Sequence, residues 1–239
     1  MMVTCRNINK SFFGGRHGNV KAVVDVSFQI KKGEAMGLVG ESASGKTTLG
    51  KIILGIVKPD SGNIEMNTKR PQVIFQDPYN SLDPKMRVRE IIGEGLIVER
   101  RYDPMEITRK VEEAADLVKL TKEALKKYPH EFSGGERQRI AIARAVVTEP
   151  EFIVCDEPVS SLDMTIQLDI LRLLKDIRQK FSMTYLFISH DLRAVKFICG
   201  RVAVMKEGRI VEEGPTAQIY HTPTHPYTKS LISSILEVG

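Results

Sequence analysis

The feature that most constrains this chain is the eight-residue stretch Gly40–Thr47, which reads GESASGKT. It has the pattern GxxxxGK[ST], follows a short apolar run at 35–39 that suits a buried strand, and precedes a run with helical spacing. A strand that turns tightly into a helix N-terminus directs several backbone N–H groups at one point, where the helix dipole also favours an anion. The stretch therefore predicts a site for the phosphates of a nucleoside triphosphate. The residues of this site are Gly40, Glu41, Ser42, Ala43, Ser44, Gly45, Lys46, Thr47 and Thr48.

Two side chains of the stretch carry chemistry of their own. We expect Lys46 to reach the β- and γ-phosphates, and the hydroxyl of Thr47 to bind Mg²⁺, a hard cation that takes oxygen ligands. A chance turn rich in glycine and serine is the alternative, but it does not explain the strand before and the helix after. The motif alone predicts that a nucleoside triphosphate binds, and it leaves open how the protein uses the nucleotide.

Composition excludes several classes of protein. The 239 residues allow one large domain or two small ones, and 42% hydrophobic with 27% charged residues is an ordinary globular balance. No stretch approaches the roughly 18 apolar residues of a membrane span, and no secretory signal is visible. Cys5, Cys155 and Cys199 lie far apart, which predicts neither a disulfide framework nor a zinc site and fits a reducing cytosol.

The net charge of +5 has several interpretations. A basic chain can meet nucleic acid, an anionic membrane surface or a bound nucleotide. Because the basic residues are dispersed along the sequence, we interpret most of them as solvated surface.

Strand and helix patterns alternate along most of the chain. After a β-rich start (2–39) with a strand at Val20–Ile30, turns are expected at Gly14-Gly15 and at residues 32–34. Helices are expected at 41–57, 133–149, 164–181 and 227–236, and a further charged, helical stretch is expected at 85–132, ended by Pro129. Strands are expected at 71–76, 151–156 and 184–189, and a hairpin at 201–211. A turn is expected at 58–62 and a loop at 77–84. Within 85–132, Asp103 is expected to cap a helix. This alternation predicts an α/β fold with a mainly parallel sheet between helices.

Polar residues come directly after the predicted strands. Gln76, the pair Asp156-Glu157 and His190 occupy such positions, as the phosphate loop does. Because ligands bind at the carboxyl ends of parallel strands, we expect these elements to converge on one edge. Asp156 is placed to support Mg²⁺, and Glu157 to accept a proton from an attacking water. The alternatives are a helix-capping acid pair and ordinary loop residues for Gln76 and His190.

Ser133-Gly134-Gly135 precedes a helix and has two interpretations. Ser133 suits an N-cap beside flexible glycines. The stretch also makes a second bare helix N-terminus, and a second anion site is useful if it completes a nucleotide bound on another subunit of a dimer.

Taken in order, these elements closely resemble the ATP-binding cassette (ABC) ATPases. The resemblance covers about residues 2–215 and includes the phosphate loop, Gln76, the signature FSGGE at 132–136, the strand ending at Asp156, Glu157, the SSLD stretch at 160–163 and His190. It implies a P-loop core with an antiparallel β-subdomain and a helical subdomain at about 77–145, together forming an ATPase domain at 1–215. Residues 216–239 are then a short C-terminal extension.

The resemblance also implies roles. Glu157, His190 and Gln76 would be catalytic, and Thr47, Gln76 and Asp156 would hold Mg²⁺. The signature residues Ser133, Gly134, Gly135 and Glu136 would contact the ATP of a partner subunit, and Asp163 would link the two sites. Phe12 would stack on adenine, with Phe13 as the second choice; from the residues alone, an aromatic here could equally be core.

Two positions depart from the family pattern. Ala43 stands where a glycine is usual, which costs about 1 kcal/mol or more if the position needs a positive φ; we expect nucleotide binding to survive. Glu136 replaces the usual glutamine of the signature, a change that the family often shows.

Within the family, the chain resembles the ATPases of dipeptide, oligopeptide and nickel importers. The motifs are GES at 40–42, FQDPYNSLDP at 75–84, YPHEFSGG at 128–135 and HPYT at 225–228. This implies an ATP-hydrolysing motor, peripheral to the cytoplasmic face of the membrane. Its partners would be a second ATPase subunit, with a heterodimer favoured over a homodimer, two permease subunits that dock near 77–100, and indirectly an extracytoplasmic solute-binding protein.

An alternative is a soluble cassette ATPase of a carbon–phosphorus lyase or nucleic-acid complex. The single cassette, the absence of a coiled-coil insertion and the absence of a basic tail argue against it, so no nucleic acid is expected. The sequence does not identify the solute. Some relatives carry an iron–sulfur cysteine cluster in a C-terminal extension, and this chain has no such cluster.

Overall fold

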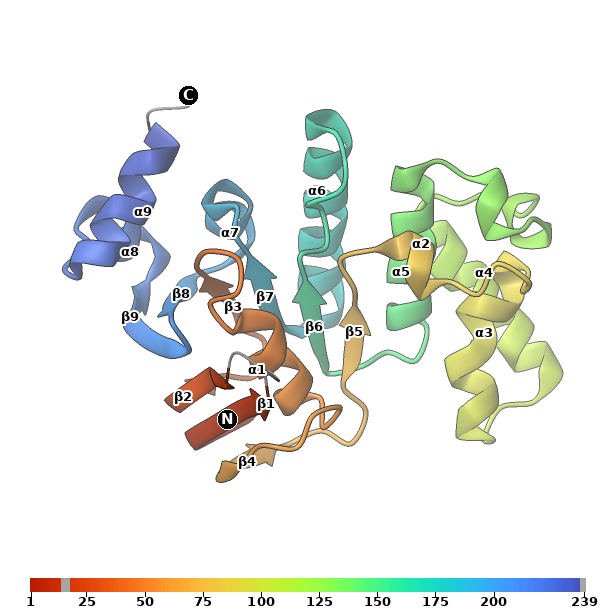
Figure 1. Ribbon diagram of the computed structural model, residues 1–239. Coiled ribbons are helices and arrows are strands. Elements are labelled where there is room, and N and C mark those ends of the chain that lie inside the picture. Colours follow the sequence, from red (N-terminus) through yellow and green to blue (C-terminus); the bar gives the residue numbers. More distant parts are fainter. Residues whose placement is uncertain (14–17, 237–239) are drawn as a thin grey trace. The chain divides into compact units, whose positions relative to one another are not determined.

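The computed structural model describes residues 1–13 and 18–236, so the turn expected at Gly14-Gly15 lies outside the described residues. The described chain forms two compact units. Unit 1 comprises Met1–Pro71 with Thr184–Gly239, and unit 2 comprises Gln72–Met183. Figure 1 draws the helices and strands of each unit.

Unit 1 begins with a three-stranded antiparallel sheet in the order β2-β1-β4. Its strands are β1 (Val3–Phe13), β2 (Asn19–Ile30) and β4 (Ser61–Met66). Val3 pairs with Ile30 on one side and with Met66 on the other, so β1 is the central strand. The turn predicted at 58–62 is therefore partly wrong. Ser61, Gly62 and Asn63 have poor strand propensity, but they form the start of β4, which pairs with the edge of β1 that β2 leaves open.

The buried core of unit 1 is a second, mainly parallel group of strands. Its order is β7-β3-β8-β9, in which only β9 runs antiparallel. The strands are β3 (Ala35–Val39), β7 (Thr184–Ser189), β8 (Arg201–Lys206) and β9 (Arg209–Pro215). Every residue of β3 and β7 is buried, as expected for parallel strands covered on both faces. The predicted strands at 35–39 and 184–189 and the predicted hairpin are confirmed.

The helices of unit 1 are α1 (Lys46–Ile53), α7 (Leu192–Ile198), α8 (Thr216–His221) and α9 (Pro226–Leu236). The helix predicted at 227–236 is confirmed and begins one residue earlier. The sequence did not predict α7 or α8, which are too short to show a helical period. The start of α8 is fixed by Thr216, whose N–H donates to the carbonyl of Gly200 and whose hydroxyl donates to that of Cys199 at 2.7 Å. In Figure 1 the blue helices α8 and α9 come after the β8–β9 hairpin.

Unit 2 contains two parallel strands and the helices around them. The strands are β5 (Gln72–Ile74) and β6 (Phe152–Asp156), and the long helix α6 (Met164–Phe181) comes after β6. The predictions of a strand at 151–156 and a helix at 164–181 are confirmed. All five residues of β6 are buried, so the chain reaches the end of this strand inside the protein.

The remaining helices of unit 2 are α2 (Pro78–Ser81), α3 (Val88–Glu99), α4 (Pro104–Leu117) and α5 (Gly134–Val146). Asp103 caps α4 as predicted: its carboxylate accepts the N–H groups of Met105 and Glu106, both at 2.8 Å. The loop predicted at 77–84 is partly wrong, because it contains the single turn α2. Pro129 does not end a helix. It begins the 3₁₀ turn Pro129–Glu131, a position where the missing N–H costs nothing.

Two further findings concern the described residues of both units. No helix among them is long and apolar enough to cross a membrane. Cys5, Cys155 and Cys199 are buried and are not joined in a disulfide among the described residues, and burial raises the pKa of the Cys5 thiol to about 12.

Candidate functional site

The loop between β3 and α1 has the conformation that a phosphate-binding loop requires. Gly45 stands at the N-cap of α1 with φ of 103°, and Ala43 two residues earlier has φ of 63°. Neither residue can belong to a right-handed helix, so the helix predicted at 41–57 begins only at Lys46 and ends at Ile53. The first turn of α1 has no acidic residue and no side-chain cap, so no negative side chain there would repel an anion.

The two outer glycines of this loop are required by packing as well as by conformation. A Cβ on Gly40 would lie 2.1 Å from the carbonyl oxygen of Met205, and one on Gly45 would lie 2.1 Å from that of Ala22. The turn of the β8–β9 hairpin also contacts the phosphate loop: the N–H of Gly208 donates to the Ser44 carbonyl at 3.0 Å. The loop is thus fitted between β2 and β8, with its backbone in close contact on both sides.

Lys46 is folded onto the loop itself. Its Nζ donates to the carbonyl oxygens of Gly40 at 2.8 Å and Glu41 at 2.7 Å, and to the Ser44 hydroxyl at 3.2 Å. Only 5% of the residue is exposed. This ammonium is therefore held beside the N-terminus of α1, where a phosphate would meet both. Thr47 next to it is exposed and offers a hydroxyl oxygen, a suitable donor for Mg²⁺.

His190 belongs to the same end of the same strands. β3 and β7 are parallel, and Val39 pairs with Ser189, so Gly40 and His190 are the next residue on each strand. His190 is exposed. Within unit 1, the expected convergence of the phosphate loop and His190 at one sheet edge is therefore present.

The corresponding edge of unit 2 brings Gln76 and the acid pair together. β5 and β6 are parallel, and Ile74 pairs with Cys155, so Gln76 and Glu157 each lie two residues beyond a paired position. Asp156 and Glu157 are each only 8% exposed. Glu157 has φ of 53°, in the left-handed region, at the point where the chain leaves β6. Neither residue caps a helix: the next one, α6, is capped by Asp163.

The signature stretch forms a complete capping box at the start of α5. The Ser133 hydroxyl accepts the Glu136 N–H at 3.4 Å, while a Glu136 carboxylate oxygen accepts the Ser133 N–H at 2.9 Å and its hydroxyl at 2.8 Å. These bonds from Ser133 lower the pKa of Glu136. The interpretation of Ser133 as an N-cap is thus confirmed. The other interpretation, an anion site for a nucleotide on a partner subunit, would use the N-terminus of this same helix, α5.

Packing requires glycine in the signature. A Cβ on Gly135 would lie 2.6 Å from Cγ2 of Ile166, in the first turn of α6. Asp163, the N-cap of α6, accepts the Ile166 N–H at 3.0 Å. The signature and Asp163 are therefore adjacent within unit 2, a neighbourhood that their spacing in sequence did not predict.

Phe12 and Phe13, at the end of β1, are both outside the core. Phe12 is 43% exposed and Phe13 is 85% exposed. The interpretation as core residues is therefore wrong for both. Lys10 Nζ lies 5.4 Å from the centre of the Phe12 ring, so one face of this ring already meets a cation.

One residue beside the phosphate loop was missed by sequence reasoning. The N–H of Glu41 donates to the hydroxyl oxygen of Tyr227, in α9, at 3.1 Å. The motif HPYT marks the segment, but nothing in the sequence predicts which element the tyrosine contacts.

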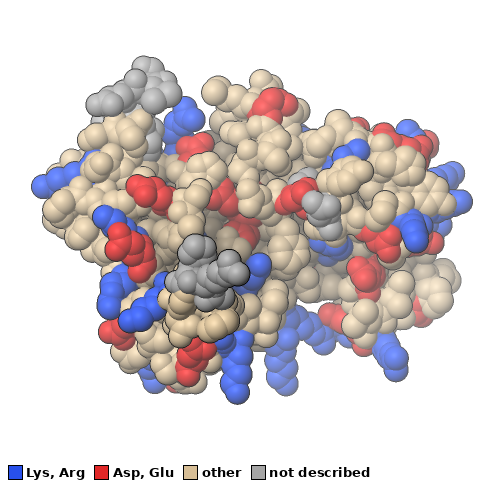
Figure 2. Space-filling model, in the orientation of Figure 1, with Lys and Arg blue, Asp and Glu red and all other residues tan. Residues whose placement is uncertain are grey.

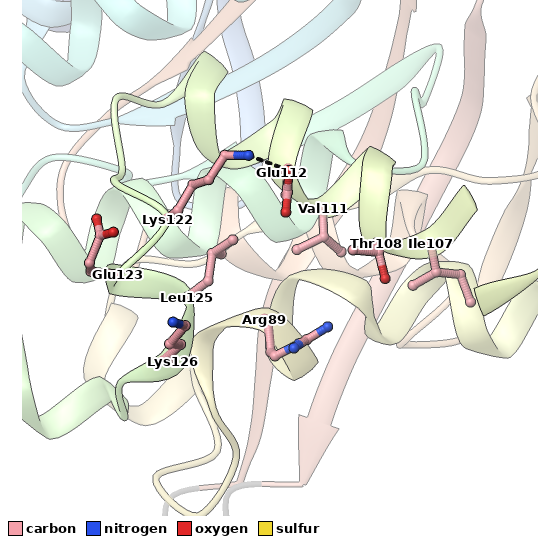
Figure 3. A pocket seen from close by; sticks show the side chains of 9 residues that line it. All are labelled: Arg89, Ile107, Thr108, Val111, Glu112, Lys122, Glu123, Leu125 and Lys126. Carbon is pink, nitrogen blue, oxygen red and sulfur yellow. Dashed lines mark hydrogen bonds and ion pairs between the residues drawn. The ribbon is translucent and has the colours of Figure 1, made fainter. Parts of the chain in front are cut away.

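A hollow of about 380 Å³ in unit 2 lies apart from these residues (Figure 3). It is bordered by α3, α4 and the 3₁₀ turn Ala124–Lys126, and Lys122 pairs with Glu112 across it at 2.8 Å. None of the residues predicted for nucleotide binding lines it. Figure 2 shows one face of the molecule, on which Lys and Arg side chains are mixed with those of Asp and Glu.

Two family models match the chain, one in its N-terminal two thirds and one at its C-terminal end. The family described as "ABC transporter" matches residues 23–160, and that described as "Oligopeptide/dipeptide transporter, C-terminal region" matches residues 211–239. An oligopeptide transport ATP-binding protein, OppF of Streptococcus mutans, is 46% identical over 252 residues, which span 99% of this chain and 82% of that protein.

Solved structures show the same fold. One is cbiO1 of Clostridium perfringens, described as part of the ABC transporter complex cbiONQ, with a TM-score of 0.81 and 28% identity over 92% of this chain and 91% of that one. Another is the ATP-binding cassette MJ0796, a dimer bound to ADP and phosphate, with a TM-score of 0.80 and 27% identity over 90% and 99%.

Proposed function

The chain belongs to the ABC transporter family and is an ATPase that uses ATP with Mg²⁺, and on this basis we propose that it is the motor subunit of a peptide importer. The observation that carries the proposal is the C-terminal match at 211–239, because it adds a peptide-transporter segment to the cassette matched at 23–160. The relative from Streptococcus mutans supports it over nearly the whole chain. Nickel or a related small solute is the neighbouring possibility that the sequence left open.

Each site residue has a defined role in this proposal. Lys46 and the N-terminus of α1 hold the phosphates, and Thr47, Gln76 and Asp156 supply oxygen ligands for Mg²⁺. Glu157 polarises the attacking water, and His190 contacts the γ-phosphate. Catalysis of phosphoryl transfer is mostly positioning and neutralisation of charge, and these residues supply both. Phe12, with Phe13 as the second choice, stacks on adenine; the exposure of both rings supports this role.

Two ATPase subunits sandwich two ATP molecules in the proposed assembly. Ser133, Gly134, Gly135 and Glu136 of each subunit face the nucleotide on the other, and Asp163 links the two sites. The contact of Gly135 with Ile166 supports this link, because it joins the signature to the first turn after Asp163. A related second ATPase is favoured as the partner. The ATPase domain spans 1–215, with its helical subdomain at about 77–145 and the extension at 216–239.

The proposed docking surface for the permeases lies within residues 77–100, at the cytoplasmic face of the membrane. Large apolar side chains are exposed in this segment, among them Tyr79, Ile97 and Val98. Exposed apolar side chains within a short segment are typical of a protein–protein contact. A solute-binding protein outside the cell would act only through the permeases.

Co-purification from membranes tests the proposal. We expect the tagged full-length chain to bring down two polytopic membrane proteins and a second ATPase. Val98→Glu places a charge on a side chain that is 73% exposed and should lose the membrane proteins. Met105→Glu, at an 85% exposed position outside the segment, is the matched control and should retain them. Recovery of nucleic acid or of soluble lyase subunits, with no permease, would overturn the proposal.

A further inference from the structure

The C-terminal extension of unit 1, which begins at residue 216, is hydrogen-bonded to the phosphate loop. Tyr227 is the second residue of α9, and its hydroxyl oxygen accepts the N–H of Glu41 at 3.1 Å, across 186 positions of sequence. The roles proposed above for the nucleotide-binding residues make no use of this contact. It joins the segment matched at 211–239 to the phosphate loop.

The contact acts on a peptide group that Lys46 holds from its other end. The Gly40 carbonyl accepts Lys46 Nζ at 2.8 Å, and the Glu41 N–H of the same peptide group donates to Tyr227. A peptide group is planar and rigid, so the two hydrogen bonds together fix its orientation. Bonds at the two ends of one amide also polarise each other and gain strength together.

The two bonds respond differently to a bound nucleotide. If Lys46 turns from these oxygens toward bound phosphates, the carbonyls of Gly40 and Glu41 lose its ammonium group. The bond from Glu41 to Tyr227 does not involve the phosphates and remains. Tyr227 is then the side chain that keeps this peptide group, at the entry to the loop, in its orientation.

Tyr227 is itself firmly anchored. Lys206 Nζ lies 4.9 Å from the centre of its ring. The carboxylate of Glu212, in β9, accepts the N–H and hydroxyl of Thr224, both at 2.8 Å, and the N–H of His225 at 3.1 Å. The tyrosine is thus tied to the β8–β9 hairpin, whose turn also holds the Ser44 carbonyl of the loop.

We propose that Tyr227 is a positioning residue of the nucleotide site, through which the C-terminal segment and the phosphate loop are coupled. The proposal rests on the assignment of Gly40–Thr47 as the ATP site. Coupling between two sites is reciprocal. If the segment steadies the loop for ATP, then bound ATP must equally steady the segment.

Tyr227→Phe is the direct test, because it removes the hydroxyl and keeps the ring over Lys206. One hydrogen bond contributes about 1 kcal/mol net, so we expect ATP to bind about three- to tenfold more weakly. The KM for ATP should rise by the same factor, with kcat at saturating ATP and the melting temperature little changed. The probe is a fluorescent ATP analogue with Mg²⁺, titrated against the full-length chain.

The matched control is Tyr220→Phe, in the same segment. The Tyr220 hydroxyl donates to the Leu192 carbonyl in α7, away from the loop. ATP affinity should be unchanged in this variant. An equal loss in both variants would show that any loosening of the segment weakens binding, and would overturn the proposal, as would unaltered affinity in Tyr227→Phe.

Hydrogen exchange supplies a readout that does not depend on activity. In the wild type, ATP should slow exchange of backbone N–H groups in α9, and Tyr227→Phe should abolish this effect. Absence of the effect in a wild type that binds ATP would contradict the coupling alone. Failure of the wild type to bind ATP would instead contradict the assignment of the ATP site.

Discussion

Two residues of the candidate site, Ala43 and Glu157, have a backbone conformation that side chains disfavour. Their φ angles are 63° and 53°. Each left-handed residue other than glycine costs about 1 kcal/mol, and such strain persists only where the surroundings impose it. At Ala43 the sequence predicted the strain, because a glycine is usual in the motif. At Glu157 no residue pattern signals it.

Replacement of Ala43 by glycine should relieve the strain in the phosphate loop. We expect Ala43→Gly to bind ATP as tightly as the wild type or up to about fivefold more tightly, the factor that corresponds to 1 kcal/mol. Titration with the fluorescent ATP analogue measures this directly.

Ala43→Val is the opposing variant. Its β-branched side chain suits a positive φ even less than alanine does, so its affinity should fall. A clear loss of affinity in Ala43→Gly would show that the alanine side chain contributes to binding and that the strain argument is wrong.

At the scale of elements, the carboxylate of Glu212 in β9 binds Thr224 and His225 of the C-terminal extension that begins at residue 216. Burial opposes ionisation of Glu212, but hydrogen bonds from Thr224 and His225 outweigh it and lower its pKa from 4.5 to about 2. The folded state therefore favours the ionised carboxylate. Its stabilising contribution is complete above pH 4.5 and is lost as the pH falls toward 2.

Melting curves of Glu212→Gln against pH test this contact. The variant should melt below the wild type at pH 7, and the difference between the two should shrink as the pH falls from 5 toward 3. Glu213→Gln is the neighbouring control, since burial raises the pKa of Glu213, opposite in sign to the shift at Glu212. A difference for Glu212→Gln that is constant with pH would show that the charge is not responsible.

Sequence reasoning located the elements whose residues are buried in a regular pattern. The helix α6 and the strands β3, β6 and β7 were predicted to within a residue or two, because long periods and apolar runs identify them. It missed β4, whose partner is a distant strand edge, and the short helices α7 and α8. Such elements depend on tertiary contacts that no local pattern records.

The candidate site shows the same division. The phosphate loop, the signature and the residues after each strand could be predicted because their chemistry is written in short motifs. The contact of Tyr227 with Glu41 and that of Gly135 with Ile166 could not, because each joins segments whose proximity is decided by the fold.

At the scale of the whole molecule, the proposed assembly is a dimer that forms around ATP. Glu157→Gln keeps the shape of the side chain and removes the base, so bound ATP should persist. We expect this variant to lose turnover and to form ATP-dependent dimers that light scattering detects. Dimers of the chain alone indicate a homodimer, and dimers only with the co-purified ATPase indicate a heterodimer.

Lys46→Ala is the companion variant, because without the ammonium the phosphates are poorly held and neither dimer nor turnover is expected.

Undiminished ATP hydrolysis in Glu157→Gln would exclude Glu157 as the base.

The fit of Gly135 against Ile166 has a mechanical meaning. The side chain of Ile166 occupies the space that a Cβ on Gly135 would need, so the first turns of α5 and α6 pack closely together. We therefore expect a displacement of either turn to be passed directly to the other. Such a displacement would link Asp163, the residue before α6, with Ser133, the residue before α5.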